Sequence, residues 1–260
     1  FRRVLFRSYK MINEFDYERL NKEWNEAKPF RHVVIDNFFD DETALKLAAD
    51  FPNVTTEKGV FYNNPLEVKK AIGDWNQFPK TTYSVFQYMC SEEFLIKIRK
   101  ITGIYNLVAD YGLHGGGFHM HPRGGKLNMH KDYSIHPKLG LERRVNIIMY
   151  MTPDWDESWG GGLQLWTHDE EKNLPKELSK QVYNKFNRAV MFDTTQNSWH
   201  GLPDPIDCPW NKSRNSLAIY YLSQPQVDAE QHTKAYFAPT KEQESDPEII
   251  DFIQERAGLK

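Results

Sequence analysis

Eight short β-type segments follow one another from residue 107 onward, and glycines and prolines punctuate the connections between them. The segments cover residues 107–111, 118–121, 127–132, 145–151, 163–166, 189–192, 198–202 and 216–222. Short strands separated by turns are typical of an antiparallel sandwich or barrel. The second half of the chain is therefore expected to form a mainly β core.

Helical signals lie on both sides of this β region. Leu20 and Trp24 stand at helical spacing within residues 15–27, and Asp40 and Asp41 are candidate caps for a helix that runs to about Asp50. Further helices are predicted over residues 82–101 and 247–256, and a break with a new cap is predicted near Ser91. Residues 32–39 indicate one early strand, and residues 53–80 are expected to be irregular. The predicted class is α+β, or mainly β with flanking N-terminal helices.

The domain organisation follows from length and continuity. A chain of 260 residues suggests one or two domains, and no linker or repeat divides it. We predict a single domain over residues 11–260, with a helical flank over about 11–105, a core over about 106–223, and a tail and helix over 224–260. Residues 1–10 precede the first methionine and carry four cations and no acid, so they are interpreted as an extension introduced by cloning or gene prediction.

Composition excludes several classes of function. The formal net charge is −3, so no bulk positive charge favours nucleic-acid binding. No apolar run approaches the roughly 20 residues of a membrane helix, and no membrane partner is expected. Two cysteines, Cys90 and Cys208, are too few for a disulfide framework and suit a reducing compartment. Without a visible targeting signal, the expected location is the cytoplasm.

Three residues form the sharpest candidate site. His130 and Asp132 are two positions apart on a predicted strand, so their side chains point to the same face, and His200 lies on a later strand. Two neutral imidazoles and one carboxylate suit Fe(II) and leave three coordination positions open. A structural zinc site would be closed by four ligands, often cysteines, and Cys90 and Cys208 lack the partner spacing.

Other polar residues offer competing interpretations. His119 and His121 share a strand face near His114 and form a rival metal cluster, but the favoured interpretation is that they line the substrate side or face solvent. Arg143 and Arg144 are candidate substrate contacts, and alternation along a strand predicts that one of them lies on the surface.

The order of these motifs resembles a known family. Residues 119–223 are similar to the Fe(II)/2-oxoglutarate-dependent dioxygenase superfamily, in its prolyl 4-hydroxylase-like branch. The segments that carry the resemblance are residues 127–132, 144–151, 154–155, 161–165, 187–192, 199–201 and 214–216. Residues 32–39 also resemble the start of such enzymes. The resemblance implies a double-stranded β-helix, the cupin-like jelly roll.

The resemblance also implies roles for individual residues. His130, Asp132 and His200 match the iron ligands, and Arg214 matches the residue that pairs with the distal carboxylate of 2-oxoglutarate. A planar guanidinium can bind such a carboxylate through two hydrogen bonds. The other expected co-substrate residues are Ser216, Tyr150 and Asn146. Arg214 lies 14 positions after His200, further than the family pattern suggests, and a loop over residues 203–211 is expected to absorb the excess.

The implied activity is hydroxylation of a C–H bond, coupled to oxidation of 2-oxoglutarate to succinate by dioxygen, with ascorbate as a candidate reductant. The substrate is expected to be a prolyl or peptidyl group or a small molecule. A carbohydrate, a secondary metabolite and a non-catalytic binding role with a vestigial metal site remain alternatives. The oligomeric state is left open. Residues 53–80 and 131–143 are predicted to border the substrate opening and to move when substrate binds.

Overall fold

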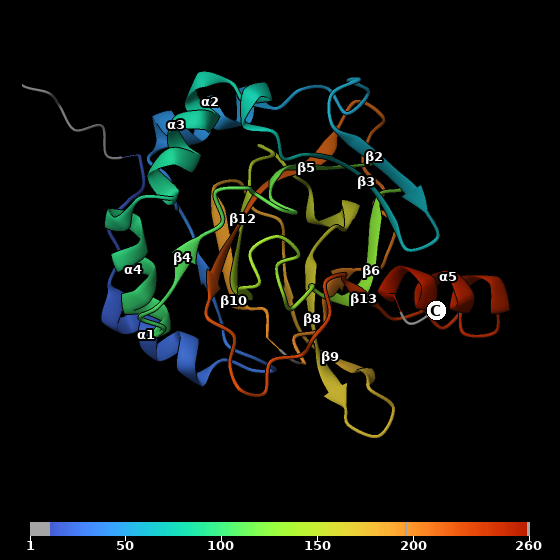
Figure 1. Cartoon of the computed structure of the whole chain (residues 1–260). Helices are drawn as coiled ribbons and strands as arrows, with labels where there is room; N and C mark the ends of the chain where they lie inside the picture. The colour runs from blue at the N-terminus through green and yellow to red at the C-terminus, as the bar shows by residue number, and fades with distance from the viewer. Residues whose placement is uncertain (1–10, 196, 259–260) are drawn as a thin grey trace, which may run out of the picture.

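Five helices surround a curled sheet of thirteen strands in the computed structural model, which describes residues 11–195 and 197–258. The predicted extension over residues 1–10 lies outside the described residues. The helices are α1 (Tyr17–Glu26), α2 (Asp41–Asp50), α3 (Lys80–Met89), α4 (Glu92–Thr102) and α5 (Pro247–Ala257). Figure 1 shows α1–α4 gathered along one side of the sheet and α5 on the opposite side.

The predicted helix signals are confirmed by the capping geometry. The side chain of Asp40 accepts a hydrogen bond from the Thr43 amide, and Ser91 separates α3 from α4 by accepting from the Phe94 amide. Gly103 ends α4 in the left-handed conformation at φ 72°, where a glycine has no Cβ to strain. Leu20 and Trp24 of α1 are both fully buried.

Each of the eight predicted β segments contains a strand. The strands are β1 (His32–Ile35), β2 (Val60–Asn64), β3 (Glu67–Ile72), β4 (Val108–Ala109), β5 (Gly117–Pro122), β6 (Lys126–Lys131), β7 (Glu142–Tyr150), β8 (Leu163–Asp169), β9 (Leu174–Val182), β10 (Arg188–Asp193), β11 (His200–Leu202), β12 (Ser213–Ser223) and β13 (Tyr236–Phe237). Their main order is β1-β10-β7-β12-β5-β3-β6-β11-β8-β9, with antiparallel neighbours throughout. The sheet curls into a nearly closed barrel, so the expected jelly roll is confirmed.

The prediction that residues 53–80 are irregular was wrong. This region contains the β2–β3 hairpin, and β3 pairs with both β5 and β6, so the flank over residues 11–105 is not purely helical. The charged residues Glu67 and Lys70 interrupt the apolar pattern by which a strand is predicted from sequence. Tertiary contacts nevertheless bury both side chains. Strand formation here depends on the neighbours available for pairing, which a local pattern does not record.

Alternation along β7 and β12 separates the core from the interior of the barrel. Val145, Ile147 and Met149 of β7 pack in the main core with residues of the helices, as do alternate residues of β12. Asn146 and Ile148 point the other way, into the barrel. The helical layer therefore fixes one face of these strands, and their other face is free to build a site. Among the described residues, no helix combines the length and apolar character that a bilayer crossing requires.

Candidate functional site

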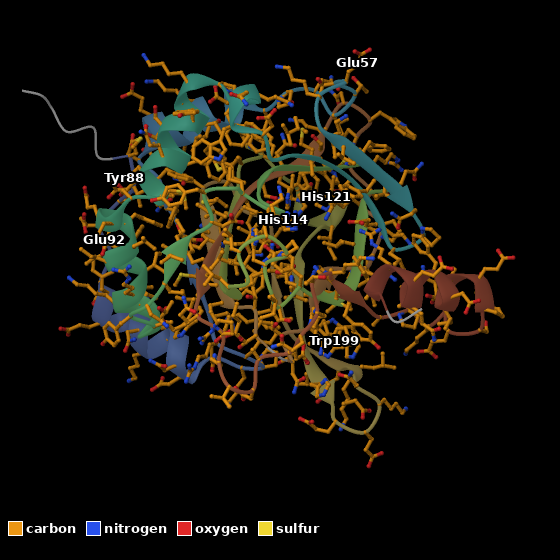
Figure 2. All side chains as sticks on the ribbon, viewed as in Figure 1. Glu57, Tyr88, Glu92, His114, His121 and Trp199 are labelled. Carbon is orange, nitrogen blue, oxygen red and sulfur yellow. The ribbon has the colours of Figure 1, made fainter. Side chains whose placement is uncertain are left out.

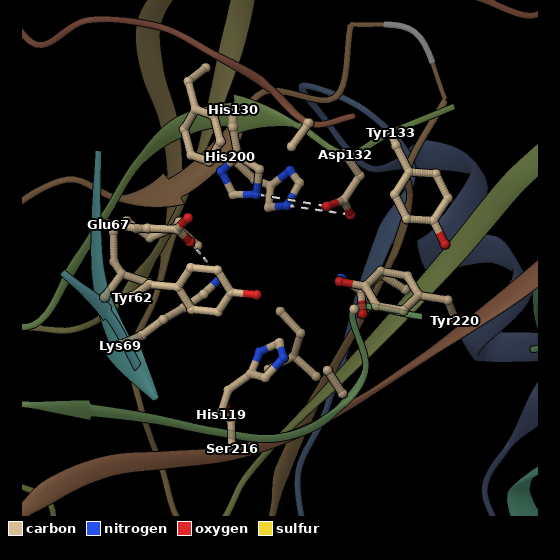
Figure 3. Close-up of a pocket in the computed structure, with 18 of the residues that line it drawn as sticks. Tyr62, Glu67, Lys69, His119, His130, Asp132, Tyr133, His200, Ser216 and Tyr220 are labelled. Carbon is tan, nitrogen blue, oxygen red and sulfur yellow. Dashed lines mark ion pairs between the residues drawn. The ribbon is translucent and has the colours of Figure 1, made fainter. Parts of the chain in front are cut away.

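A cavity of about 490 Å³ occupies the interior of the barrel (Figure 3). Both halves of the sheet line it, and so do the β2–β3 hairpin and the chain that follows β12. Figure 2 shows His114 and His121 near the middle of the molecule, whereas Glu57 and Glu92 lie at its edge. The cavity is lined by most of the polar residues singled out in the sequence, His114 and His121 among them.

His130, Asp132 and His200 converge on one wall of this cavity. His130 and His200 face each other across the β6–β11 pairing, and Asp132 directly follows β6. The three ligand atoms lie within 4.8 Å of one another, and the two imidazole Nε2 atoms are each 3.8 Å from an oxygen of Asp132. Figure 3 shows both imidazoles turned toward the carboxylate. Within residues 11–195 and 197–258, no other group of histidines, cysteines and acids converges in this way.

Backbone contacts set the tautomers of both imidazoles. Nδ1 of His130 lies 3.0 Å from the carbonyl oxygen of Asn128, and Nδ1 of His200 lies 2.8 Å from that of Ser198. A carbonyl oxygen only accepts, so each Nδ1 carries the hydrogen and each Nε2 directs a lone pair toward Asp132. Burial lowers the pKa of His130 to about 3 and also lowers that of His200. Both rings are therefore neutral near pH 7, as metal ligation requires.

Asp132 is ionised although it is buried. Burial, the largest single effect, would raise its pKa, but Arg143 together with the neighbouring histidines and Lys69 outweighs burial, and the pKa is lowered. Its Oδ2 atom has no hydrogen-bond partner among the described residues. Arg143 contacts only Oδ1, so Oδ2 beside two converging lone pairs is poorly satisfied unless a metal cation binds there. The donor set of two neutral imidazoles and one carboxylate therefore fits Fe(II).

Arg214 forms a second polar centre in the same cavity. It lies opposite His121 in the β12–β5 pairing and is 2% exposed, and its Nε donates to the Gly161 carbonyl at 2.7 Å. Its guanidinium carbon lies 4.8 Å from the centre of the Tyr150 ring. The Tyr150 hydroxyl has no partner within the described chain. A buried cation with an unused hydroxyl beside it offers the charge and the donors that a carboxylate needs.

The structure brings Arg214, Ser216 and Tyr150 together but not Asn146. Ser216 lies opposite Tyr150 and two positions along β12 from Arg214, so all three share one end of the strand face. Asn146 lies opposite Tyr220, roughly 13 Å along β7 from Tyr150 at ~3.3 Å per residue. It does line the cavity, as expected, but away from the Arg214 end.

The rival histidines do not join the triad. His119 and His121 line the cavity from β5, and no acid, cysteine or third histidine in the described part of the chain completes a metal set with them. Burial lowers the pKa of His119 to about 3 and that of His121 well below its usual value. His114 instead packs 5.1 Å from the Tyr133 ring. The expectation of a surface arginine was wrong, since Arg143 and Arg144 are 2% and 9% exposed.

Sequence reasoning missed the part that the C-terminal segment plays. Strand β13 pairs with β6, and Phe237 stacks on the His130 ring with centroids 5.2 Å apart. Arg256 of α5 pairs with the buried Glu67 of β3, which also binds Lys69 at 3.0 Å. The only local signal was a short apolar run over residues 235–238 after a polar stretch. The β2–β3 hairpin and α5 therefore meet beside the cavity, where Figure 3 shows Tyr62 opposite the triad.

A family model described as the 2OG-Fe(II) oxygenase superfamily matches residues 116–222. The prolyl 3-hydroxylase OGFOD1 of Mus musculus is 27% identical over 185 residues, which cover 68% of this chain and 30% of the mouse protein. The match thus spans less than a third of that relative.

One solved structure with a TM-score above 0.5 shares the fold. A prolyl hydroxylase of Trichoplax adhaerens, in complex with a peptide fragment of the hypoxia inducible factor oxygen degradation domain, superposes with a TM-score of 0.53 at 16% identity. That match covers 80% of this chain and 90% of the other. A Pseudomonas putida prolyl-4-hydroxylase reaches a TM-score of 0.48 at 15% identity and covers 79% of this chain and 99% of its own.

Proposed function

We propose that the protein hydroxylates a prolyl or other peptidyl residue. The premise is that residues 116–222 of this chain belong to the 2OG-Fe(II) oxygenase superfamily. Fe(II) would be held by His130, Asp132 and His200, and 2-oxoglutarate by Arg214 with Tyr150 and Ser216. The observation that carries the proposal is a buried triad, in which Oδ2 of Asp132 has no partner among the described residues, in the same cavity as a buried arginine.

Iron, 2-oxoglutarate and dioxygen bound here would supply the oxidising power for C–H hydroxylation, with release of succinate and carbon dioxide. The contribution of the chain is binding, orientation and exclusion of water. The carbonyls of Asn128 and Ser198 hold the imidazoles in the ligating tautomer. Phe237 and Phe192 cover the imidazoles of His130 and His200, with ring centroids 5.2 and 4.7 Å away, which keeps water from these ligands.

Arg214 supplies a fixed positive charge for a dicarboxylate. Its guanidinium is fully desolvated before any ligand arrives, so an anion placed there restores the interactions lost on burial. The Tyr150 hydroxyl, unpartnered among the described residues, can donate to the same anion. This arrangement favours a co-substrate with a distal carboxylate over a 2-oxo acid without one.

The mouse relative is a prolyl 3-hydroxylase, and this similarity favours a peptide substrate. The Trichoplax protein, which shares the fold, was solved with a peptide. We also propose a cytoplasmic location for the protein and ascorbate as its reductant. The buried free thiols of Cys90 and Cys208 agree with a reducing compartment.

The test is a turnover screen that measures succinate against prolyl peptides, other peptides, free amino acids and glycans. Prolyl peptides should stimulate succinate formation and gain one oxygen atom by mass spectrometry, and the His200→Ala variant should do neither. Anaerobic addition of Fe(II) and 2-oxoglutarate should produce a visible metal-to-ligand charge-transfer band. A protein that binds neither iron nor 2-oxoglutarate would be a jelly-roll binding module, and stimulation by glycans alone would replace the peptide with a carbohydrate.

A further inference from the structure

Arg143 is a second buried arginine in the cavity, and its guanidinium is contacted through its terminal nitrogens and by two aromatic rings. It lies on β7 and is 2% exposed. Its Nη2 donates to the His114 carbonyl at 2.7 Å, and its Nη1 lies 3.2 Å from Oδ1 of Asp132. The rings of Tyr133 and Tyr220 cover both faces of the guanidinium, each with its centroid 3.4 Å from the central carbon. Both terminal nitrogens and both faces are thus in contact, although Nε has no hydrogen-bond partner among the described residues, so the end of the group has little freedom to move.

This contact makes the two oxygens of Asp132 unequal. Each oxygen lies 3.8 Å from one imidazole Nε2, Oδ1 from that of His130 and Oδ2 from that of His200. Only Oδ1 is also engaged by Arg143, and Oδ2 has no hydrogen-bond partner among the described residues. A carboxylate can bind a metal through one oxygen or through both. When a fixed cation holds one oxygen, the other becomes the available ligand atom.

We propose that Arg143 is a positioning residue that holds Oδ1 of Asp132 and thereby presents Oδ2 as a single ligand atom to the metal. The inference rests on the proposed function, since it takes His130, Asp132 and His200 as the metal site. Its consequence is that Asp132 occupies one coordination position rather than two. The positions that a chelating co-substrate and dioxygen require then stay open.

Arginine suits this task better than lysine. Its planar group fits between two rings and still presents N–H donors at its edge, whereas an ammonium group is a point charge without a face to stack. A cation near a metal also repels it, so removal of Arg143 has two opposite effects on metal affinity. If positioning dominates, affinity falls, and if repulsion dominates, affinity rises.

The experiment measures Co(II) binding to the full chain, freed of metal, by titration and by visible absorption of the bound Co(II), whose intensity reports coordination number. Arg143→Met removes the charge and keeps the bulk, Arg143→Lys keeps the charge, and Arg144→Met is the matched control on the other face of β7. We expect about 10–100-fold weaker binding for Arg143→Met, as for other groups that orient metal ligands. Partial recovery is expected in Arg143→Lys, and an unchanged affinity in Arg144→Met.

The Co(II) spectrum should also change in Arg143→Met, which a purely structural role would not cause. Wild-type affinity, tighter binding or an unchanged spectrum in that variant would overturn the inference. If Arg143→Met does not fold, Tyr220→Leu removes one face of the stack and should weaken binding in the same direction, and unchanged binding there would also overturn it. If wild-type protein itself fails to bind Co(II), the proposed function fails instead.

Discussion

At the scale of single residues, the candidate metal site depends on where protons and lone pairs lie. His130 and His200 each use Nδ1 on a backbone carbonyl, which commits Nε2 to the cavity. Asp132 stays ionised beside Arg143 despite its burial. The three groups are thus prepared to bind a cation before it arrives, and no proton has to be displaced near pH 7.

Removal of one ligand should therefore abolish metal binding rather than weaken it slightly. Asp132→Ala and His200→Ala should lose more than the about 10–100-fold in affinity that follows loss of a supporting hydrogen bond, because only three side chains hold the metal. The control is His232→Ala, since His232 pairs with Glu230, and this variant should bind the metal normally. Isothermal titration with Mn(II) checks this, and normal affinity in either ligand variant would refute the triad.

Arg214→Ala should weaken 2-oxoglutarate binding without affecting the metal. Loss of one partner of a buried charge pair costs about 2–5 kcal/mol, or about 30-fold to several-thousand-fold in affinity. Tyr150→Phe should cost about 0.5–1.5 kcal/mol for one hydrogen bond. Titration of 2-oxoglutarate into Mn(II)-loaded protein measures both. Equal binding by Arg214→Ala and wild type would assign the carboxylate to another cation.

At the scale of elements, β5 carries two neutral histidines along one face of the cavity, of which His121 is buried and His119 half-buried. The pKa of His121 lies well below its usual 6.5 because of burial and then because of Arg214, which lies opposite on β12. As the pH falls through 6.5, the unfolded chain takes up a proton that the folded protein does not. The free energy of unfolding should then decrease by up to about 1.4 kcal/mol per pH unit for this residue.

Urea unfolding of metal-free protein between pH 6.5 and 4.5 tests this prediction. Wild type should lose stability across the window, and His121→Phe should lose it less steeply. Asp36, whose pKa is lowered to about 2 by Arg188, is the control. Its stabilisation is lost only as the pH falls below its usual value of 3.8, so Asp36→Asn should leave the slope above pH 4.5 unchanged. Parallel slopes for His121→Phe and wild type would show that His121 is not held neutral.

The β2–β3 hairpin and the segment after β6 both reach the cavity, through Tyr62, Lys69 and Tyr133. The prediction that they border the substrate opening and respond to substrate has a direct measurement. Hydrogen exchange over residues 53–80 and 131–143 should slow when saturating substrate is added, while exchange in α1 stays constant. Unchanged exchange in both segments would argue against their contact with substrate.

At the scale of the whole molecule, the C-terminal helix α5 contacts the early β2–β3 hairpin beside the cavity. Glu67 is 1% exposed, and Arg256 and Lys69 both pair with it. Burial alone would raise the pKa of Glu67, but the two cations outweigh it. Arg256→Ala should therefore lower the free energy of unfolding by about 1–3 kcal/mol, because part of the compensation for a buried carboxylate is lost.

A double-mutant cycle separates this pairing from the packing of α5. In a Glu67→Gln background, Arg256→Ala should cost less, since no buried charge is left uncompensated. Chemical denaturation of the four proteins supplies the cycle. Strictly additive effects would mean that Arg256 acts through its hydrocarbon chain alone.

Local patterns in the sequence were sufficient to predict the helices, their caps, the eight strand segments and the resemblance to the superfamily. Spacing also predicted that His130 and Asp132 share a face, because side chains on a strand alternate with a period of two. Such features depend on neighbours close in the chain. The strands β3 and β9 were not predicted. The partners β5 and β6 of β3 lie far away in sequence, whereas β9 pairs with the neighbouring β8 and consists mostly of exposed polar residues, which give no apolar strand pattern.

Tertiary structure alone decided which residues enter the cavity. It brought Arg214 into the barrel despite the long loop after His200 and left Asn146 at the other end of the face. It stacked Phe237 on His130 and enclosed Arg143 between two tyrosines, next to Asp132. These contacts join segments up to about a hundred residues apart, and they exist only because strand pairing and burial close the barrel. A sequence motif can name metal ligands, but the groups that orient and cover those ligands are selected by packing in three dimensions.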